Sequence, residues 1–151
     1  MKRVKRHHIT SFSASLLILM LSCVTASCEI HTSNNGDLDG FWQLSYVDTL
    51  ATGGTTDMRM EQISWAFQAN LMELRNPHNV FIARFDHTGN SLTVYDVYYS
   101  QRDLGDVVVT DQSVLYPFGI QSLREHFTII NLDDSDMTLQ SADLRLHLRK
   151  Y

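Results

Sequence analysis

The sequence predicts an all-β protein: an eight-stranded antiparallel up-and-down barrel with at most a short helix. From Gly40 onward, apolar and polar residues mostly alternate, which is the period-two pattern of half-buried strands. Clusters of turn-forming residues separate several of these runs, and links this short favour antiparallel neighbours. Eight runs without a long interruption favour a closed meander, because closure removes exposed strand edges. A chain of 151 residues is long enough for one such domain.

The alternation places each strand in turn. We expect strands near 41–47, 62–74, 79–86, 91–100, 106–110, 126–132, 137–140 and 144–150. Turn chemistry lies at 76–78, 87–90 and 133–136. Met137 and Leu139 occupy odd positions, whereas the leucines after position 143 occupy even ones. Because a slip of one residue turns every side chain to the other face, a bulge or tight turn must lie in 141–143.

Two segments also carry a helical pattern. Apolar residues between Met60 and Leu74 recur at helical spacing, but Ile63, Trp65 and Phe67 alternate without a break and include two aromatics, so we favour a strand. The second segment, 119–125, is compatible with one turn of helix.

The first 28 residues have the organisation of an export signal. A cationic start precedes an apolar stretch that is shorter than the ~20 residues of a spanning helix. The stretch leads into small residues that end in Cys28, and this close resembles the lipobox of bacterial lipoproteins. We therefore expect a signal peptide at 1–27, lipidation of Cys28, a polar tether at 28–39 and the barrel at 40–151. Cys23 is the competing lipidation site.

Charge and cysteine content exclude several classes of protein. The formal charge is −5, but four of the 12 basic residues precede position 28. The remaining chain carries eight basic against 17 acidic side chains, which argues against nucleic-acid binding. Both cysteines, Cys23 and Cys28, lie in the targeting segment, so we expect the domain to be stable without an internal disulfide.

A family resemblance follows from the two ends of the predicted barrel. Gly40-Phe41-Trp42 resembles the G-x-W signature of lipocalins, and residues 146–151 resemble their closing strand with its basic residue. From Asp37 to Tyr151 the chain is similar to small lipocalin-like lipoproteins of Bacteroidetes. This resemblance implies a calycin-type barrel whose base holds Gly40 and Trp42. Arg149 is the expected cation over the tryptophan ring, with Lys150 as the alternative. It also implies a lipid-anchored location at the bacterial cell envelope, with the outer membrane favoured.

The barrel interior is the predicted functional region. An eight-stranded barrel is either filled by side chains or holds one small ligand. We expect a small apolar ligand, in a pocket lined by Leu44, Tyr46, Trp65, Phe67, Phe81 and Phe85. The alternative is a filled barrel that binds protein partners at the envelope. In that case the partners would bind an exposed patch of tyrosines. The candidates are Tyr95, Tyr98, Tyr99 and Tyr116. Tyr95 and Tyr99 lie on one face of their strand and Tyr98 lies on the other.

The search for chemistry predicts no enzyme, cofactor or metal site. The histidines from His31 onward are scattered singly, without metal-ligand spacing. The acidic run at 133–136 lacks the spacing of a calcium loop and is typical of a hairpin turn. No nucleophile elbow or phosphate loop is present. The membrane, through the lipid, and a small apolar molecule are therefore the expected partners.

Overall fold

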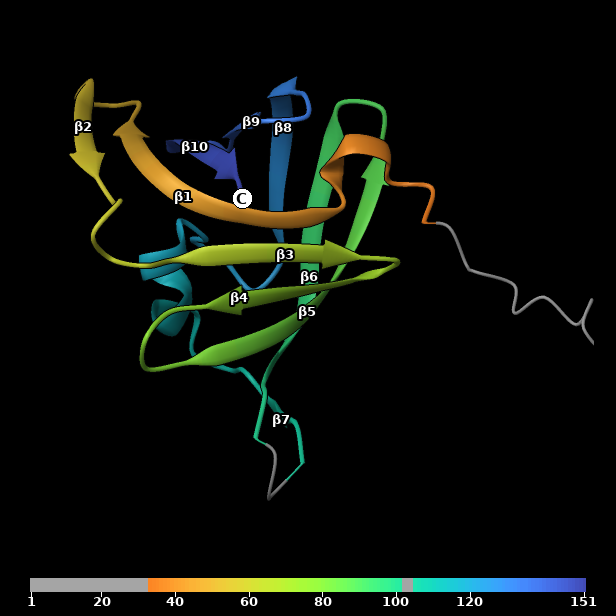
Figure 1. The fold of residues 1–151 in the computed structure, drawn as a ribbon. Coiled ribbons are helices and arrows are strands. Elements are labelled where there is room, and N and C mark those ends of the chain that lie inside the picture. Colours follow the sequence, from red (N-terminus) through yellow and green to blue (C-terminus); the bar gives the residue numbers. More distant parts are fainter. Residues whose placement is uncertain (1–32, 102–104) are drawn as a thin grey trace, which may run out of the picture. The chain divides into compact units, whose positions relative to one another are not determined.

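The computed structural model describes residues 33–101 and 105–151, which form an antiparallel β-barrel (Figure 1). Eight strands make the ring in the order β1-β3-β4-β5-β6-β8-β9-β10, and β10 pairs with β1 to close it. Their bounds are β1 Gly40–Thr49, β3 Ser64–Gln68, β4 Leu71–Arg75, β5 Val80–Thr88, β6 Ser91–Tyr99, β8 Glu125–Leu132, β9 Asp136–Gln140 and β10 Leu144–Lys150. The predicted closed eight-stranded barrel is confirmed.

Two short strands lie outside the ring. β2 (Gly54–Asp57) pairs with the second half of β1, and β7 (Val107–Val108) pairs with the end of β6. β2 is not predicted from the sequence because all four of its residues are exposed, so no apolar alternation marks it. The predicted strand at 62–74 is in fact the hairpin of β3 and β4, which turns at Ala69 with a positive φ of 55°.

Three bulges change which face the side chains present. The pairing of β1 with β10 shifts between Leu44 and Tyr46, and that of β5 with β6 shifts opposite Asp96, which has a φ of 51°. The third shift, in β8, lies between Ile129 and Asn131. A bulge inserts one extra residue and therefore reverses the alternation beyond it. The predicted break at 141–143 is confirmed as the turn between β9 and β10, where the Ser141 N–H donates to the Leu144 carbonyl at 2.9 Å.

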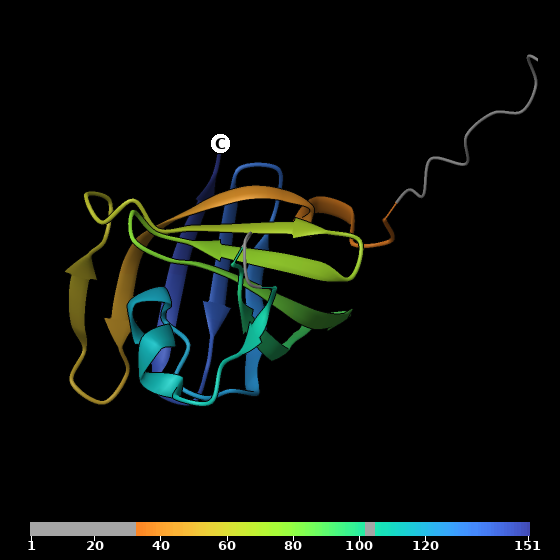
Figure 2. The ribbon, with the colours of Figure 1, turned by 90° about the horizontal axis from the view of Figure 1, so that it is seen from below.

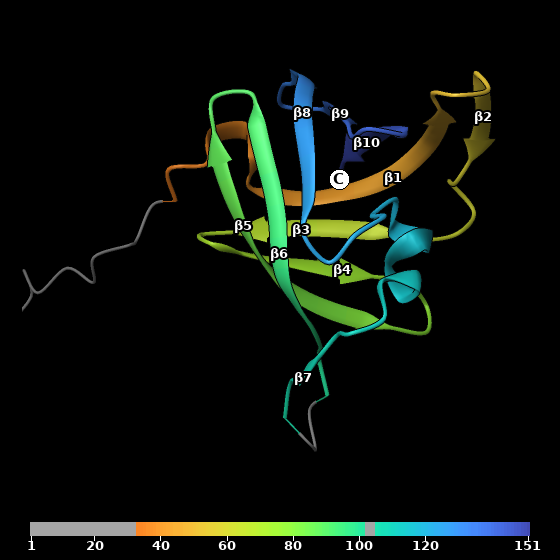
Figure 3. The same cartoon turned by 180° about the vertical axis from the view of Figure 1, so that it is seen from behind.

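The described residues include two 3-10 helices, which lie at opposite ends of the barrel (Figure 2). Helix η2 (Gly36–Leu38) precedes β1, and the end of the barrel where β1 begins is called the base below. Helix η3 (Gln112–Phe118) lies at the other end, where β1 ends and β3 begins (Figure 3). The helical turn expected at 119–125 is therefore wrong in position. The helix lies just upstream and stops at Gly119, whose φ of 80° is left-handed.

Candidate functional site

The base of the barrel is organised around Trp42. This side chain is fully buried, and its Nε1 donates a hydrogen bond to the Leu38 carbonyl of η2 at 2.8 Å. Lys150 Nζ lies 4.8 Å from the centre of the Trp42 ring and donates to the Asp37 carbonyl at 2.7 Å. Gly40 is favoured here because its φ is 121°, a conformation that residues with a Cβ rarely adopt; a Cβ would also lie 2.9 Å from Lys150 Cε and displace that side chain. First strand, last strand and η2 thus meet at one tryptophan.

The cation over the ring is Lys150, and the prediction of Arg149 is wrong. Arg149 pairs with Gln43 on β1 and its side chain is exposed on the outer wall. Lys150 is in phase with Leu146 and Leu148, whose side chains are buried inside, so it reaches the tryptophan as the strand ends. The direction in which the strand points each side chain therefore decides which cation covers Trp42, although a guanidinium stacks better on an aromatic ring.

Five of the six predicted pocket residues lie in the core. Leu44, Trp65, Phe67, Phe81 and Phe85 are each at least 96% buried. The aromatic rings meet from different walls: Trp65 of β3 contacts Phe127 of β8 at 5.8 Å between ring centroids, although these strands are not neighbours. Phe67 lies 5.1 Å from Phe85 in an edge-to-face arrangement. These rings fill the middle of the barrel.

Tyr46 is the exception, and its assignment to the interior is wrong. The bulge after Leu44 turns it to the outer wall, where Arg59 lies 5.1 Å from its ring centre. Val47 packs against the core in its place. The bulge at Asp96 has the same effect on the tyrosines of β6: Tyr99 packs inward, 4.7 Å from Phe81, so it does not share a face with Tyr95 as expected. The exposed tyrosine patch is correspondingly smaller.

The end of the barrel opposite the base is filled by the η3 segment. Leu115, Phe118 and Ile120 are fully buried, and the Phe118 ring meets Phe81 at 5.4 Å. Gly119 follows η3 so closely against β10 that a Cβ would lie 2.6 Å from a methyl group of Leu146. The segment is held mainly by apolar packing. We call Leu115, Phe118 and Ile120 the plug.

Glu125 is a buried charged residue that the sequence analysis missed. It shares the inward phase of Phe127 at the start of β8 and is 8% exposed. Its carboxylate accepts hydrogen bonds from the Gln121 N–H at 2.9 Å and the Ser122 hydroxyl at 3.0 Å. Through these hydrogen bonds Glu125 stabilises the turn at Gln121 and Ser122, which follows the plug. The only sequence signal is an acidic residue at an inward position of a strand.

One buried polar atom has no partner among the described residues. Trp65 is fully buried, yet its indole Nε1 makes no hydrogen bond. Leaving a buried donor unsatisfied costs roughly 1–3 kcal/mol. Trp42, directly opposite in the β1–β3 pairing, has the same N–H fully satisfied. Among the described residues, the interior thus contains one indole N–H for which the chain supplies no acceptor.

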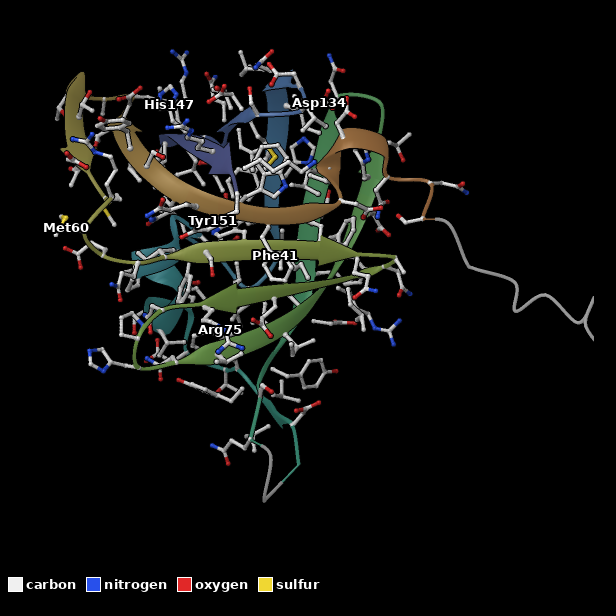
Figure 4. The ribbon with its side chains drawn as sticks, viewed as in Figure 1. Phe41, Met60, Arg75, Asp134, His147 and Tyr151 are labelled. Carbon is white, nitrogen blue, oxygen red and sulfur yellow. The ribbon has the colours of Figure 1, made fainter. Side chains whose placement is uncertain are left out.

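A polar groove of about 610 Å³ lies on the outer wall, where β2 extends β1. Asp48 accepts from the Thr55 hydroxyl at 2.6 Å and pairs with His147 Nε2 at 2.8 Å, so it joins β1, β2 and β10. These two hydrogen bonds, Thr55 first, hold the pKa of the Asp48 carboxyl below its usual value. Figure 4 shows His147 on this wall. The histidine is thus paired with a structural carboxylate.

Within residues 33–101 and 105–151, no group of three His, Cys, Asp or Glu side chains is arranged to hold a metal ion. No helix in that part of the chain is long and apolar enough to cross a bilayer. The acidic run at 133–136 forms the β8–β9 turn, where Asp133 accepts from the Ser135 and Asp136 N–H groups. Cys28, the predicted lipidation site, lies outside the described residues.

Comparison with known proteins assigns the family. The model of the family described as "lipocalin-like domain" matches residues 19–151. The chain belongs to this lipocalin-like family. A solved lipocalin-like protein from Bacteroides uniformis is 19% identical with a TM-score of 0.60, covering 77% of this chain and all of that one. An uncharacterized protein from Bacteroides eggerthii is 18% identical with a TM-score of 0.52, covering 76% of this chain and 99% of that one. No curated protein matches the chain.

The lipocalin-like fold suggests a barrel that binds a small ligand, and families of this fold are typically non-enzymatic binding proteins. In this lipocalin-like barrel, the base is closed by hydrogen bonds of the backbone and of Lys150, whereas the other end is closed by apolar side chains. The interior, its plug and the unpartnered Trp65 donor are therefore the candidate functional site.

Proposed function

We propose that this protein is a lipid-anchored, non-enzymatic binding protein of the cell envelope that holds a small apolar molecule inside its barrel. The observation that carries the proposal is the plug. Its three side chains are fully buried, apolar and contributed by a connection outside the eight-stranded ring. An apolar ligand that takes their place preserves the apolar contacts of the barrel wall.

When a ligand replaces the plug, the apolar burial that the plug loses is offset by the apolar burial that the ligand gains. Fully burying a large apolar side chain contributes about 1.5–3 kcal/mol, so withdrawing the plug without replacement is costly. A ligand that fills the same volume returns this contribution and buries its own apolar surface. Binding is therefore selective for molecules that match the plug in size and polarity. The strands of the ring need not separate.

The anchor is proposed to be lipid on Cys28. A single acyl chain gives only marginal membrane binding, so stable attachment requires several chains, as the lipobox-like close implies. Fatty-acid labelling should be lost in Cys28→Ala and retained in Cys23→Ala. The opposite pattern would move the mature N-terminus to Cys23 and contradict the assignment.

The binding proposal is tested by native mass spectrometry of the lipidated protein extracted from its own envelope. We expect a co-purifying small molecule that is released when the protein is unfolded. The same substitution at two sites supplies a matched pair: Phe85→Trp adds volume inside, where the side chain is 4% exposed, and Phe41→Trp adds it outside, where exposure is 62%. The first should lower ligand occupancy and the second should not. Equal occupancy in both variants would contradict binding inside the barrel.

A second candidate function is a protein-binding module with a filled barrel. The observation that favours it is an outer groove of about 460 Å³ beside the base, lined in part by Phe41 and Tyr151. Both aromatic side chains are exposed, Phe41 on β1 and Tyr151 just after β10 (Figure 4), and aromatic residues are enriched at protein interfaces. An extracted protein that carries a protein adduct but no small molecule would favour this function. That adduct should be lost in Phe41→Ser and retained in Ile130→Ser, a change at another exposed apolar residue.

A further inference from the structure

We propose that the ligand of this barrel is an uncharged, mostly apolar molecule with a hydrogen-bond acceptor, such as an ester or ketone oxygen, which accepts from Trp65 Nε1. The inference rests on the proposed function, because it assumes that a small molecule occupies the interior. It adds the chemical class of that molecule and the residue that selects it.

The unpartnered donor lies inside the barrel. Trp65 and Phe67 are the two buried, inward-facing residues of β3, and their neighbours on either side point outward. The Trp65 ring reaches Phe127 on a strand that does not adjoin β3. Its Nε1 is shielded from solvent and has no acceptor among the described residues. A molecule that enters the interior can therefore supply the acceptor that the protein lacks.

The charge of the site decides between neutral and ionised ligands. Among the described residues, Glu125 is the one charged side chain in the buried set, and its carboxylate already accepts two hydrogen bonds beside the plug. Lys150 is occupied at the base by Asp37 and the Trp42 ring. A ligand carboxylate in the interior would be buried without a cation to pair with it, and it would share the interior with the negative charge of Glu125. Burying an unpaired charge is costly, so the site favours an uncharged acceptor.

The competing explanation is that the N–H points at an aromatic face. The Trp65 and Phe127 rings lie at an interplanar angle of 68°, an edge-on arrangement that allows a weak N–H···π contact. In that case Trp65 would need no acceptor, and the polarity of the ligand would not matter. The two explanations predict different behaviour of the indole proton when ligand binds.

The experiment compares three probes of similar length: methyl decanoate, undecane and decanoate. The mature protein, lipidated on Cys28 and ¹⁵N-labelled, is placed in phosphatidylcholine nanodiscs, and the indole N–H signals of Trp42 and Trp65 are followed by NMR. Trp42 is an internal control because its N–H is already bonded to Leu38. We expect methyl decanoate to move the Trp65 proton downfield, as a new hydrogen bond would, and to leave the Trp42 proton in place.

Two variants separate polarity from volume. Trp65→Phe removes the donor and should weaken methyl decanoate binding at least about fivefold, with undecane binding within about twofold, since one neutral hydrogen bond is lost. Phe67→Leu changes volume alone and should affect both probes equally. Partitioning into the lipid is the same for every variant, so ratios between variants report the barrel. If Trp65→Phe does not fold, the indole shift in the unaltered protein decides alone.

The outcomes are distinguishable. If methyl decanoate and undecane bind equally well and the Trp65 signal stays in place, the donor is not used and the inference is overturned, while binding inside the barrel stands. Decanoate binding as tightly as the ester would overturn the requirement for an uncharged ligand. If none of the three probes binds, the proposed function fails and this inference fails with it.

Discussion

The two ends of the barrel are closed by different physical means. At the base, Trp42 Nε1, Lys150 Nζ and the Tyr151 N–H all donate to backbone carbonyls, at 2.8, 2.7 and 3.0 Å. At the opposite end, the plug contributes buried apolar side chains, and Glu125 holds only the turn beyond it. Directional hydrogen bonds have few alternative partners, whereas apolar contacts are non-directional and can be exchanged for those of a ligand.

Under the proposed function, this difference separates an end that maintains the fold from an end that admits the ligand. The two tryptophans differ in a related way: Trp42 pairs with Trp65 across β1 and β3, and of the two only Trp42 has an acceptor for its indole N–H among the described residues. A buried polar group that stabilises the fold has its hydrogen-bond partner within the chain. A polar group without one marks the region in which we expect a partner from outside.

The largest effect is expected at the base. Trp42→Ala removes a fully buried indole and its hydrogen bond, and should lower the free energy of unfolding by about 3–5 kcal/mol. Chemical denaturation followed by circular dichroism measures this loss. A loss below about 1 kcal/mol would contradict the structural role of the base.

A smaller loss, with a gain of function, is expected at the plug. Leu115→Ala should lower stability by about 2–3 kcal/mol, in the lower part of the range for such truncations, because η3 lies in a connection that can resettle. It should also bind methyl decanoate more tightly than the unaltered protein, since space opens in the interior. Weaker binding in Leu115→Ala would show that the plug contributes to the site and is not displaced from it.

The next effect concerns the cation at the base. Lys150→Met should cost about 0.5–2 kcal/mol, the range of a partly shielded cation–π contact. Arg149→Ala should stay within about 0.5 kcal/mol because that side chain is exposed. In a Trp42→Leu background, the part of the Lys150 effect that depends on the ring should disappear, and the bond to Asp37 should account for the remainder. A double-mutant cycle measures the difference.

The smallest effect is expected where Asp48 joins β1, β2 and β10. Because its pKa is lower in the folded chain than in the unfolded one, its ionisation stabilises the fold above the unfolded value of about 3.9, and this contribution is lost as the pH falls through the lower folded value. Asp48→Asn should cost under about 1 kcal/mol at neutral pH, and the difference from the unaltered protein should shrink below about pH 4. Denaturation between pH 3 and 7 tests this. A difference that grows on acidification would contradict the assignment.

The barrel and most of its base could be predicted from the sequence, but the packing of the interior could be predicted only in part. Alternation places most strands, and Gly40 with Trp42 identifies the base. Alternation wrongly places Tyr46 inside the barrel and Tyr99 on the same face as Tyr95, because a bulge is set by pairing with a distant strand and leaves no local pattern. The hairpin turn at Ala69 was missed because the residue with positive φ there is an alanine, which a turn rule does not select.

The plug and the free indole depend on contacts across the barrel. Nothing near Phe118 in the sequence indicates that it meets Phe81 of β5. Similarly, whether Trp65 has an acceptor depends on every residue that surrounds its ring, and these come from several strands. Stacking chemistry alone favours Arg149 over Lys150, whereas strand phase favours Lys150. The phase of Leu146 and Leu148 was visible in the sequence and pointed to Lys150.

The pairing of the first strand with the last has a consequence for how the chain folds. Trp42 lies opposite Lys150, so the ring closes only when almost the whole chain is available. Contacts between residues so distant in sequence slow folding, and all-β domains of this kind fold in roughly milliseconds to seconds. A nascent chain that still lacks β10 therefore has no closed barrel to form. Late closure of the barrel keeps the chain unfolded while it is being synthesised. An unfolded chain is also the form that can pass through a protein-conducting channel.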